Sequence, residues 1–514
     1  MQQLREFYER RRFLLNKEGV KLQVVLALDA GTTSVRTLAV DPSGEILTTS
    51  QQEFTQIYPE PGLIEHDPEE IWLAAANTLK EVSEQIEKMG HEVVSLGITN
   101  QRETAIIWDR ESGTPLHNAI VWQDRRTTER CQELIRQGCL SEIRAKTGLV
   151  LDPYFSASKF EWMIKSSSVD LGKKFCLGTV DSWLIWKLTN GKVHATEPSN
   201  ASRSMLFDLK KGQWSDSLCN MFSVPIDSLP EIRSTSGYFG STANEGPLGK
   251  EVPIRSAIGD QQSSLFGQAC FRSGDTKNTY GTGSFILTNL GEGIPPINDG
   301  LITTVAWKLN SESPLTYAVE GSIFSTGATV QWLRDELGII KDSSELEQLA
   351  MTSPNNGGVV IVPAFSGLGS PWWDPDARGI IAGLTRGVGK AELARATIES
   401  MAFQTRDVLE TIKKNGTLTP EKLKADGGAS VMDLLMQFQA DQLKIPVIRS
   451  SNTESTAMGA AYLAGLASGI WESLEEIETL WKGDEPFLPD VNSPLPDKLY
   501  ESWLDAVNRS RIRT

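Results

Sequence analysis

The sequence has little cysteine and histidine, and neither shows a pattern that would hold a metal or a disulfide framework. Five cysteines and four histidines occur among 514 residues. The cysteines lie far apart, form no Cys-x-x-Cys pair and are odd in number, and the histidines show no metal-ligand spacing. This usage argues against a structural zinc site and a secreted disulfide scaffold, and it favours a reducing, cytoplasmic location.

Long apolar runs and an excess of positive charge are also missing. No run approaches the roughly 18 residues that span a bilayer, and residues 1–21 lack the apolar core of a secretion signal. The formal net charge is −16, with charged residues spread along the chain. Neither nucleic acid nor an anionic membrane is therefore expected as the main partner. Residues 1–21 are expected to form a short packed or frayed extension, with a partner contact as the alternative.

What the chain does have is an alternation of strand-like and helix-like segments, which predicts layered α/β structure. The segments are residues 24–28, 95–98, 254–258 and 358–362 for strands, and 68–84, 393–412 and 456–467 for helices. The length is too great for one core and suits two domains. We place their boundary in the stretch 267–274, which gives domains 22–270 and 271–514 after the extension.

A carboxylate, a tight turn and three hydroxyl residues follow the first predicted strand. Asp29 ends the strand, Gly31 lets the chain pass close to a ligand, and Thr32, Thr33 and Ser34 come next. Hydroxyl and backbone N–H groups in such a loop can surround phosphate oxygens, and Asp29 is placed to hold a hydrated Mg²⁺. The loop lacks the Gly-Lys-Ser/Thr ending of a P-loop. An ordinary β-hairpin is the alternative interpretation.

A second loop of the same kind lies about half a chain further on. Thr282 and Ser284 alternate with glycines between two β-prone runs, and a third, Gly-rich turn at 427–428 precedes a helical stretch at 434–441. Two phosphate loops and a Gly-rich turn for a nucleoside predict a particular α/β fold. It consists of two related, actin-like (ribonuclease H-like) ATPase domains that face an interdomain cleft for ATP and substrate.

Three polar clusters do not fit a plain core or a solvated surface. Arg102 and Glu103 follow the strand at 95–98 and offer donors and acceptors suited to hydroxyl groups, with a surface salt bridge as the alternative. Asp260 follows a buried strand and opens a predicted helix, either as a helix cap or as a general base. Tyr154 is either a phenolic donor to a small ligand or a structural residue.

These clusters resemble the FGGY carbohydrate kinase family. One family signature is matched by YFSASKFEWM at 154–163, and the other by GIIAGL at 379–384, continuing to residue 399. Further family-like stretches are PGLIEHDP at 61–68, ITNQRET at 98–104, VWQ at 121–123, GTVDSW at 178–183, ASR at 201–203, NTYGTG at 278–283, QWLRD at 331–335 and WDPDARG at 373–379. The number and order of these motifs carry the resemblance, which runs from about residue 24 to past residue 465.

The resemblance implies an enzyme that uses ATP to phosphorylate glycerol to sn-glycerol 3-phosphate, for entry into glycerolipid and glycolytic metabolism. Asp260 would be the general base that takes the proton of the attacking hydroxyl. The residues implied to hold the three hydroxyls are Arg102, Glu103, Tyr154, Asp260 and Gln261. Trp122 and Phe285 would flank the carbon chain. Because water could also accept the phosphoryl group, we expect the domains to close on the substrate.

The resemblance also implies ATP and Mg²⁺ as cofactors. Asp29 would reach Mg²⁺ through water. The residues implied to contact the phosphates are Thr32, Thr33, Ser34 and Arg36, and those implied to contact the nucleotide from the second domain are Thr282, Gly327, Gln331 and Gly428. The chain departs from the glycerol-phosphorylating members at Met432, where they commonly have Asn, so we expect the adenine contacts to be weakened or rearranged.

Two other interpretations remain open. The first is another kinase of the same family that acts on a ketose or pentitol, although Arg102 and Glu103 beside two aromatic walls favour a small triol. The second is an actin-like or chaperone-like ATPase that works by binding partners, which leaves the three polar clusters unexplained. The family implies a homo-oligomer, either a dimer or a tetramer. Its partners would be glycerol and ATP/ADP, without nucleic acid or a membrane.

Overall fold

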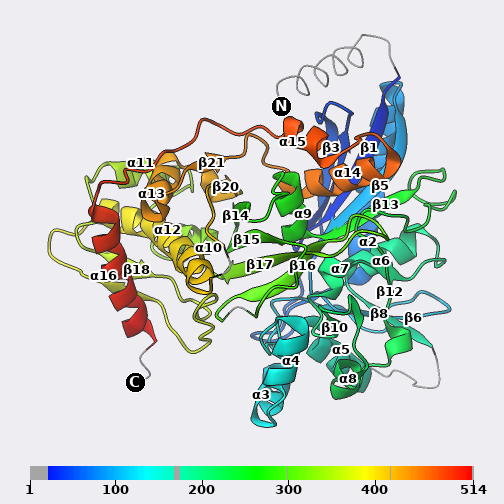
Figure 1. Cartoon of the computed structure of the whole chain (residues 1–514), viewed down its shortest axis with the longest axis horizontal. Coiled ribbons are helices and arrows are strands. Elements are labelled where there is room, and N and C mark those ends of the chain that lie inside the picture. Colours follow the sequence, from blue (N-terminus) through cyan, green and yellow to red (C-terminus); the bar gives the residue numbers. More distant parts are fainter. Residues whose placement is uncertain (1–20, 167–173, 298, 417, 512–514) are drawn as a thin grey trace.

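The computed structural model describes residues 21–166, 174–297, 299–416 and 418–511. The molecule is built on two large mixed sheets, with helices packed against them (Figure 1). The predicted extension, residues 1–21, falls outside the described residues except for Lys21. Within the described residues, no helix has both the length and the apolar composition needed to cross a membrane.

The first sheet has the strand order β13-β5-β1-β2-β3. Its strands are β1 (Gln23–Ala30), β2 (Ser34–Val40), β3 (Ile46–Glu53), β5 (Glu92–Asn100) and β13 (Ile254–Gly259). Strands β13, β5 and β1 run parallel, whereas β2 and β3 are antiparallel to their neighbours. The strands predicted at 24–28, 95–98 and 254–258 are confirmed.

The second sheet repeats this arrangement. Its order is β16-β17-β15-β14-β20-β21, with β14 (Thr276–Tyr280), β15 (Ser284–Gly291), β16 (Ile302–Trp307), β17 (Thr316–Ile323), β20 (Leu423–Asp426) and β21 (Val447–Arg449). Strands β14, β20 and β21 are parallel, and β15 returns antiparallel to β14. The hairpins β1–β2 and β14–β15 thus occupy equivalent places, which places the two predicted phosphate loops at equivalent turns.

The helices follow from local sequence signals. In α2 (Pro68–Lys88), Asp67 accepts the N–H of Glu69 at 2.8 Å and Pro68 occupies the first turn, so the helix start is well specified. The other helices are α3 (Thr128–Arg136), α4 (Leu140–Thr147), α5 (Ser156–Ser166), α6 (Val180–Leu188), α7 (Pro198–Ala201), α8 (Asp216–Met221), α9 (Asp260–Gly267), α10 (Gly327–Asp335), α11 (Glu345–Met351), α12 (Lys390–Lys414), α13 (Asp433–Leu443), α14 (Ser455–Ser468), α15 (Leu474–Leu480) and α16 (Leu495–Ser510). The predicted helices at 68–84, 393–412 and 456–467 correspond to α2, α12 and α14.

Short elements complete the two domains. Two-stranded pairs are formed by β4 (Glu65–His66) with β7 (Ala119–Ile120), β6 (Ile106–Asp109) with β8 (Phe175–Gly178), β9 (Ala195–Thr196) with β12 (Glu231–Ile232), β10 (Phe207–Asp208) with β11 (Gln213–Trp214), and β18 (Val360–Val362) with β19 (Ile380–Ala382). The 3₁₀ turns are η1 (Ile226–Ser228) and η2 (Gly428–Val431). The predicted strand at 358–362 is therefore β18, two residues shorter at its start.

Helix α14 comes from the second half of the chain and packs on the first sheet, beside α9, β1 and β5 (Figure 1). The two helices touch where both lack side chains: a Cβ on Gly459 would lie 1.9 Å from the backbone oxygen of Ser263, and one on Gly267 would lie 1.9 Å from that of Ser455. This contact fixes α9, which carries Asp260. The domain boundary at residue 270 stays a prediction, and α14 belongs by packing to the core of the first sheet.

Candidate active site

Arg102 and Asp260 meet at the carboxyl edge of the first sheet. Parallel strands β5 and β13 end side by side, with Asn100 opposite Gly259, so the residues that follow them converge. The Arg102 Nε lies 3.1 Å from Asp260 Oδ1, and the same oxygen accepts the N–H of Gln261 at 2.7 Å. Gly259 is the N-cap of α9 and Asp260 is the first helical residue, so Asp260 lies one position past the cap that was expected while its carboxylate still accepts an N–H of the first turn.

Arg102 and Glu103 belong to a buried network of two arginines and two glutamates. Glu103 Oε1 accepts from Arg203 Nε at 2.5 Å, and Glu320 of β17 accepts from Arg102 Nη1 at 2.6 Å and from Arg203 Nη2 at 3.0 Å. None of the four side chains is more than 2% exposed. The surface-salt-bridge alternative for Arg102 and Glu103 is therefore wrong.

The pKa values of this network follow from burial and pairing. Burial raises the pKa of Glu103, against the effect of Arg203 and Arg102. Burial acts in the same direction on Glu320, but Arg102 and Arg203 outweigh it and lower its pKa to about 2. Both arginines keep raised pKa values in spite of burial, because the glutamates favour their charged forms. Pairing therefore favours the charged forms of Glu320 and the two arginines, whereas burial opposes ionisation of Glu103.

Aromatic rings border these polar groups. The Trp122 ring contacts Tyr154 edge-on at 5.6 Å between centroids and Phe285 at 6.5 Å. The Arg102 guanidinium lies 5.8 Å from the centroid of Phe285, and its Nη2 lies 3.5 Å from the Tyr154 hydroxyl. Residues predicted as hydroxyl-binding and as apolar walls are thus brought together, with Phe285 supplied by the second sheet.

The first predicted phosphate loop is the tight β1–β2 turn. The Gly31 N–H donates to the Ser34 carbonyl at 3.0 Å, and the Trp122 Nε1–H donates to Thr32 Oγ1 at 3.1 Å, which joins the loop to the aromatic wall. Thr33 is exposed. Arg36 forms an ion pair with Glu454, next to the start of α14.

Asp29 lies at the end of β1, close enough to Asp260 for their charges to interact. Burial and the Asp260 carboxylate raise the pKa of Asp29 to about 7, with Arg36 acting against them. Two carboxylates that disfavour each other's charge suit a hard cation, and Mg²⁺ is held in proteins by one or two carboxylates, water and substrate phosphate. In the described part of the chain, no group of three or more His, Cys, Asp or Glu could hold a metal by itself. The residues present fit a Mg²⁺ that arrives with a phosphate ligand.

The second predicted phosphate loop docks on the start of α10. Gly281 N–H donates to the Gly283 carbonyl at 2.8 Å, and Gly327 N–H donates to the Gly281 carbonyl at 3.0 Å. A Cβ on Gly427, whose φ is +89°, would lie 2.5 Å from the Tyr280 oxygen, so the third turn also touches this loop. The predicted nucleotide residues Thr282, Gln331 and Gly428 are exposed and Gly327 is half-buried.

Met432 is buried and belongs to the apolar core of the second domain. Its backbone carbonyl accepts the N–H of Met436 at the start of α13. Its thioether therefore contributes packing next to the third turn, whereas its neighbour Val431 is exposed.

Three buried charged residues of the site were not predicted to act in it: Arg203, Glu320 and Lys277. Arg203 occurs in a family-like stretch to which no role was attached. Glu320 and Lys277 lie inside strands, and Lys277 Nζ donates to Gln261 Oε1 at 2.7 Å. A single charge within a β-prone run was the available signal, because a charge inside a sheet must find a partner.

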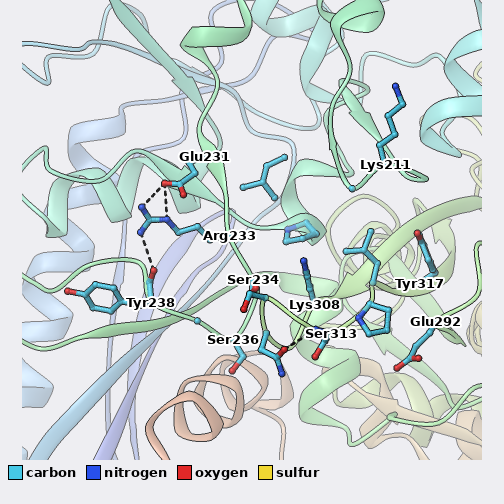
Figure 2. A pocket seen from close by; sticks show the side chains of 18 of the residues that line it. Lys211, Glu231, Arg233, Ser234, Ser236, Tyr238, Glu292, Lys308, Ser313 and Tyr317 are labelled. Atoms are coloured by element: carbon cyan, nitrogen blue, oxygen red, sulfur yellow. Dashed lines mark hydrogen bonds and ion pairs between the residues drawn. The ribbon is translucent and has the colours of Figure 1, made fainter.

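A separate cavity of about 780 Å³ lies away from these residues. It is lined by the loop 231–238, the turn at 210–212 and the connection between β16 and β17, and none of the predicted site residues borders it. Figure 2 shows Arg233 turned toward Glu231 and the Tyr238 backbone, with which it forms hydrogen bonds. This cavity therefore plays no part in the site described above.

Comparisons with known proteins agree with this geometry. The N-terminal domain model of the FGGY family of carbohydrate kinases matches residues 24–267, and the C-terminal domain model matches residues 276–468. A glycerol kinase of Alkaliphilus oremlandii is 50% identical over 95% of this chain and 97% of its own length. Glycerol kinase 2 of Thermotoga maritima is 49% identical over 95% of this chain and 99% of its own length.

Solved structures share the architecture. A Plasmodium falciparum glycerol kinase, crystallised with ADP, matches with a TM-score of 0.90 and 36% identity over 97% of this chain and 100% of that one. A gluconate kinase of Lactobacillus acidophilus matches with a TM-score of 0.86 at 23% identity over 95% of this chain and 98% of that one, a likeness of fold alone. With both domain models matched in order and the relatives covered almost end to end, the chain belongs to the FGGY family of carbohydrate kinases and has its two-domain, actin-like fold.

Proposed function

We propose that this chain transfers the γ-phosphoryl group of ATP to glycerol, giving sn-glycerol 3-phosphate and ADP. Relatives named glycerol kinase that are about half identical over nearly the whole chain support the proposal. The observation that carries it is the geometry of Asp260. Its Oδ1 lies within hydrogen-bond distance of Arg102 Nε and the Gln261 N–H, and among the described residues no donor contacts Oδ2. One oxygen is thus anchored while the other can accept a proton.

Glycerol offers three hydroxyls and little apolar surface, so its selection depends on polar groups that remain unpaired when a hydroxyl is missing. We assign this role to Arg102, Glu103, Tyr154 and Gln261, with Trp122 and Phe285 against the carbons. Among the hydrogen bonds that Arg102 donates, the longest is the 3.5 Å one to Tyr154, which a substrate hydroxyl could replace. Hydrogen bonds to charged groups contribute roughly 1.5–3 kcal/mol each.

In the proposed step, a terminal hydroxyl oxygen of glycerol attacks the γ-phosphorus in line. The new O–P bond forms as the bond to the β,γ-bridging oxygen breaks, the hydroxyl proton passes to Asp260 Oδ2, and ADP leaves with the bond's electron pair. Domain closure on glycerol would exclude water as a competing acceptor.

The nucleotide would lie between the two loops. We assign phosphate contacts to Thr32, Thr33, Ser34 and Arg36, and nucleotide contacts to Thr282, Gly327, Gln331 and Gly428. Arg36 would exchange its Glu454 partner for a phosphate oxygen. Asp29 would hold Mg²⁺ through water, and the ion would supply charge neutralisation at the phosphate oxygens.

A coupled assay of ADP release tests the proposal. Wild type is measured with MgATP and glycerol, xylulose, ribitol or no acceptor. We expect a glycerol-dependent rate that Asp260→Asn lowers roughly a hundredfold to ten-thousandfold, while the exposed α16 variant Asp505→Asn keeps it. Turnover with xylulose or ribitol but not with glycerol would assign another acceptor, and no acceptor-dependent turnover in a folded, ATP-binding protein would refute a kinase.

We also propose a cytoplasmic location and a homo-oligomeric state for this protein. All five cysteines are unpaired thiols, which supports a reducing, cytoplasmic compartment. The homo-oligomeric state, dimer or tetramer, stays a prediction that light scattering would test.

A further inference from the structure

Lys277 is a buried cation at the centre of the site. It lies on β14 beside α9 (Figure 1), and its side chain is 0% exposed. Its Nζ donates to Gln261 Oε1 at 2.7 Å and to Thr279 Oγ1 at 2.8 Å. Within the described ranges, no carboxylate lies within ion-pair distance of it. Burial of an ammonium group without a direct counter-charge is costly, so a role is expected for it.

The contact with Lys277 decides which way the Gln261 amide faces. An ammonium group has three donors and no acceptor. The Gln261 atom beside it must therefore be the carbonyl oxygen, and the amide cannot flip without facing N–H against N–H. Its Nε2 then points away from Lys277. Gln261 directly follows Asp260 at the start of α9, and its backbone N–H donates to Asp260 Oδ1 at 2.7 Å.

We propose that Lys277 is a positioning residue that fixes the Gln261 amide so that its Nε2 donates to the substrate hydroxyl whose proton Asp260 accepts. A hydroxyl oxygen is both donor and acceptor, and the pair Asp260 and Gln261 matches both properties. This inference rests on the proposed function and extends it. It assigns Lys277 to glycerol binding through Gln261, without contact to the substrate.

The charges around Lys277 make the arrangement sensitive to pH. Burial lowers the pKa of Lys277 to about 8, while Asp426, Asp260 and Glu320 act to keep its charge and Arg102 acts against it. Asp426 stands opposite Thr279 in the neighbouring strand, and its Oδ1 is buried without a hydrogen-bond partner. Once deprotonated, the amine of Lys277 can accept as well as donate, and the Gln261 amide loses its fixed orientation.

The test compares wild type with Lys277→Met, Gln261→Ala and the double variant, in steady-state kinetics from roughly pH 7 to pH 9.5. For wild type we expect the KM for glycerol to rise above about pH 8. Lys277→Met should have a KM for glycerol that is already roughly tenfold above that of wild type at pH 7 and does not rise further with pH, with kcat and the KM for ATP changed much less. In the double variant the Lys277 change should add nothing to Gln261→Ala, because one acts through the other.

Other results would overturn the inference. Additive effects in the double variant would show that Lys277 acts independently of Gln261, as a purely structural residue would. If Lys277→Met does not fold, Gln261→Glu is measured in its place. Gln261→Glu keeps an acceptor for Lys277 and removes the amide donor, so it should raise the KM for glycerol as Gln261→Ala does.

The proposed function and this inference fail in distinguishable ways. Wild type that phosphorylates glycerol normally, with Lys277→Met indistinguishable from it, refutes only the role of Lys277. If wild type shows no turnover, isothermal titration with glycerol decides whether it still binds glycerol. A wild type that neither phosphorylates nor binds glycerol refutes both, whereas a wild type that binds glycerol without turnover still tests Lys277 through the dissociation constants of the same variants.

Discussion

Both carboxylate oxygens of Glu320 accept hydrogen bonds from the Arg102 guanidinium, with Oε2 2.6 Å from Nη1 and Oε1 3.2 Å from Nη2. Arg102 follows β5 of the first sheet, and Glu320 lies in β17 of the second. The same carboxylate also accepts from Arg203. Arg102, which we propose to bind the substrate, is thus oriented from the opposite domain by an ion pair that is buried on both sides.

We predict that Glu320→Gln weakens both stability and glycerol binding. The substitution leaves Arg102 and Arg203 short of one buried negative charge, and removal of one partner from such a pair costs about 3–5 kcal/mol. We expect a loss near the lower end of this range, because Gln keeps one acceptor. Denaturant unfolding and glycerol titration measure it, with the exposed Glu312→Gln as control. Unchanged glycerol affinity in a folded Glu320→Gln would contradict the role.

The pH dependence of the same group has a definite sign. Arg102 and Arg203 lower the pKa of Glu320 from 4.5 to about 2, against the effect of burial. A group whose pKa is depressed by folding contributes stability above its unfolded pKa and loses it as the pH falls through the folded one. The stability difference between wild type and Glu320→Gln should therefore shrink as the pH drops from about 4.5 toward 2.

Asp407 should give the opposite pH dependence. It accepts from Tyr500 at 2.6 Å and from Trp503 at 2.9 Å, which ties α12 to α16. Burial raises its pKa to about 6, although these donors act to lower it. The folded state then favours the protonated acid, so this contribution is complete below the ordinary pKa of an aspartate and is lost as the pH rises through about 6.

Unfolding of wild type and Asp407→Asn across this range checks the prediction. The stability of wild type relative to the variant should fall by about 3 kcal/mol between acidic and neutral pH. Asp505→Asn, which removes an exposed carboxylate of the neighbouring helix α16, is the matched control. A constant difference for Asp407→Asn would show that this carboxyl does not titrate with folding.

The hydrogen bond from Trp122 to Thr32 predicts that the first phosphate loop depends on the aromatic wall for its position. Trp122→Phe keeps an aromatic wall and removes the Nε1–H that reaches Thr32 at 3.1 Å. Loss of one hydrogen bond of about 1 kcal/mol should lower kcat/KM for ATP roughly fivefold. Thr32→Ser, which retains the hydroxyl oxygen, should stay close to wild type. Equal kcat/KM for ATP in Trp122→Phe and wild type would show that the loop does not depend on the wall.

The hairpins and most of the site could be predicted because their signals are local. A strand that ends in Asp29, then Gly31 and a run of hydroxyls, specifies a turn within a few residues. Asp260 after a buried strand likewise marks a sheet edge. The family motifs then implied the roles that we propose for these residues. The structure adds that β5 and β13 are parallel neighbours, which is why residues far apart in sequence meet.

The partners of Glu320 and Lys277 could not be predicted, for the opposite reason. Each lies inside a strand whose pattern indicates only burial, and its partners come from other elements: Arg102 lies 218 residues before Glu320, and Gln261 faces Lys277 from a helix. The packing of α14 on the first sheet was missed in the same way. Its apolar face gave no sign of which domain it covers, and the choice depends on the close approach of Gly459 to α9.

Gly327 and Gly428 are both proposed nucleotide contacts, and they should respond differently to alanine. A Cβ on Gly327 would lie 2.7 Å from the Gly281 oxygen, whereas one on Gly428 meets nothing within 4 Å. Gly327→Ala must therefore push α10 away from the second phosphate loop, which should lower both thermal stability and ADP affinity.

Gly428→Ala should leave the melting temperature of the free protein unchanged, since its backbone accepts a side chain there. If the base lies against this turn, the new methyl group contacts only the nucleotide, and ADP affinity falls by roughly tenfold, as an overpacked contact would cause. Melting curves with and without MgADP separate the two cases, and a Gly428→Ala that melts and binds ADP like wild type would remove this turn from the nucleotide site.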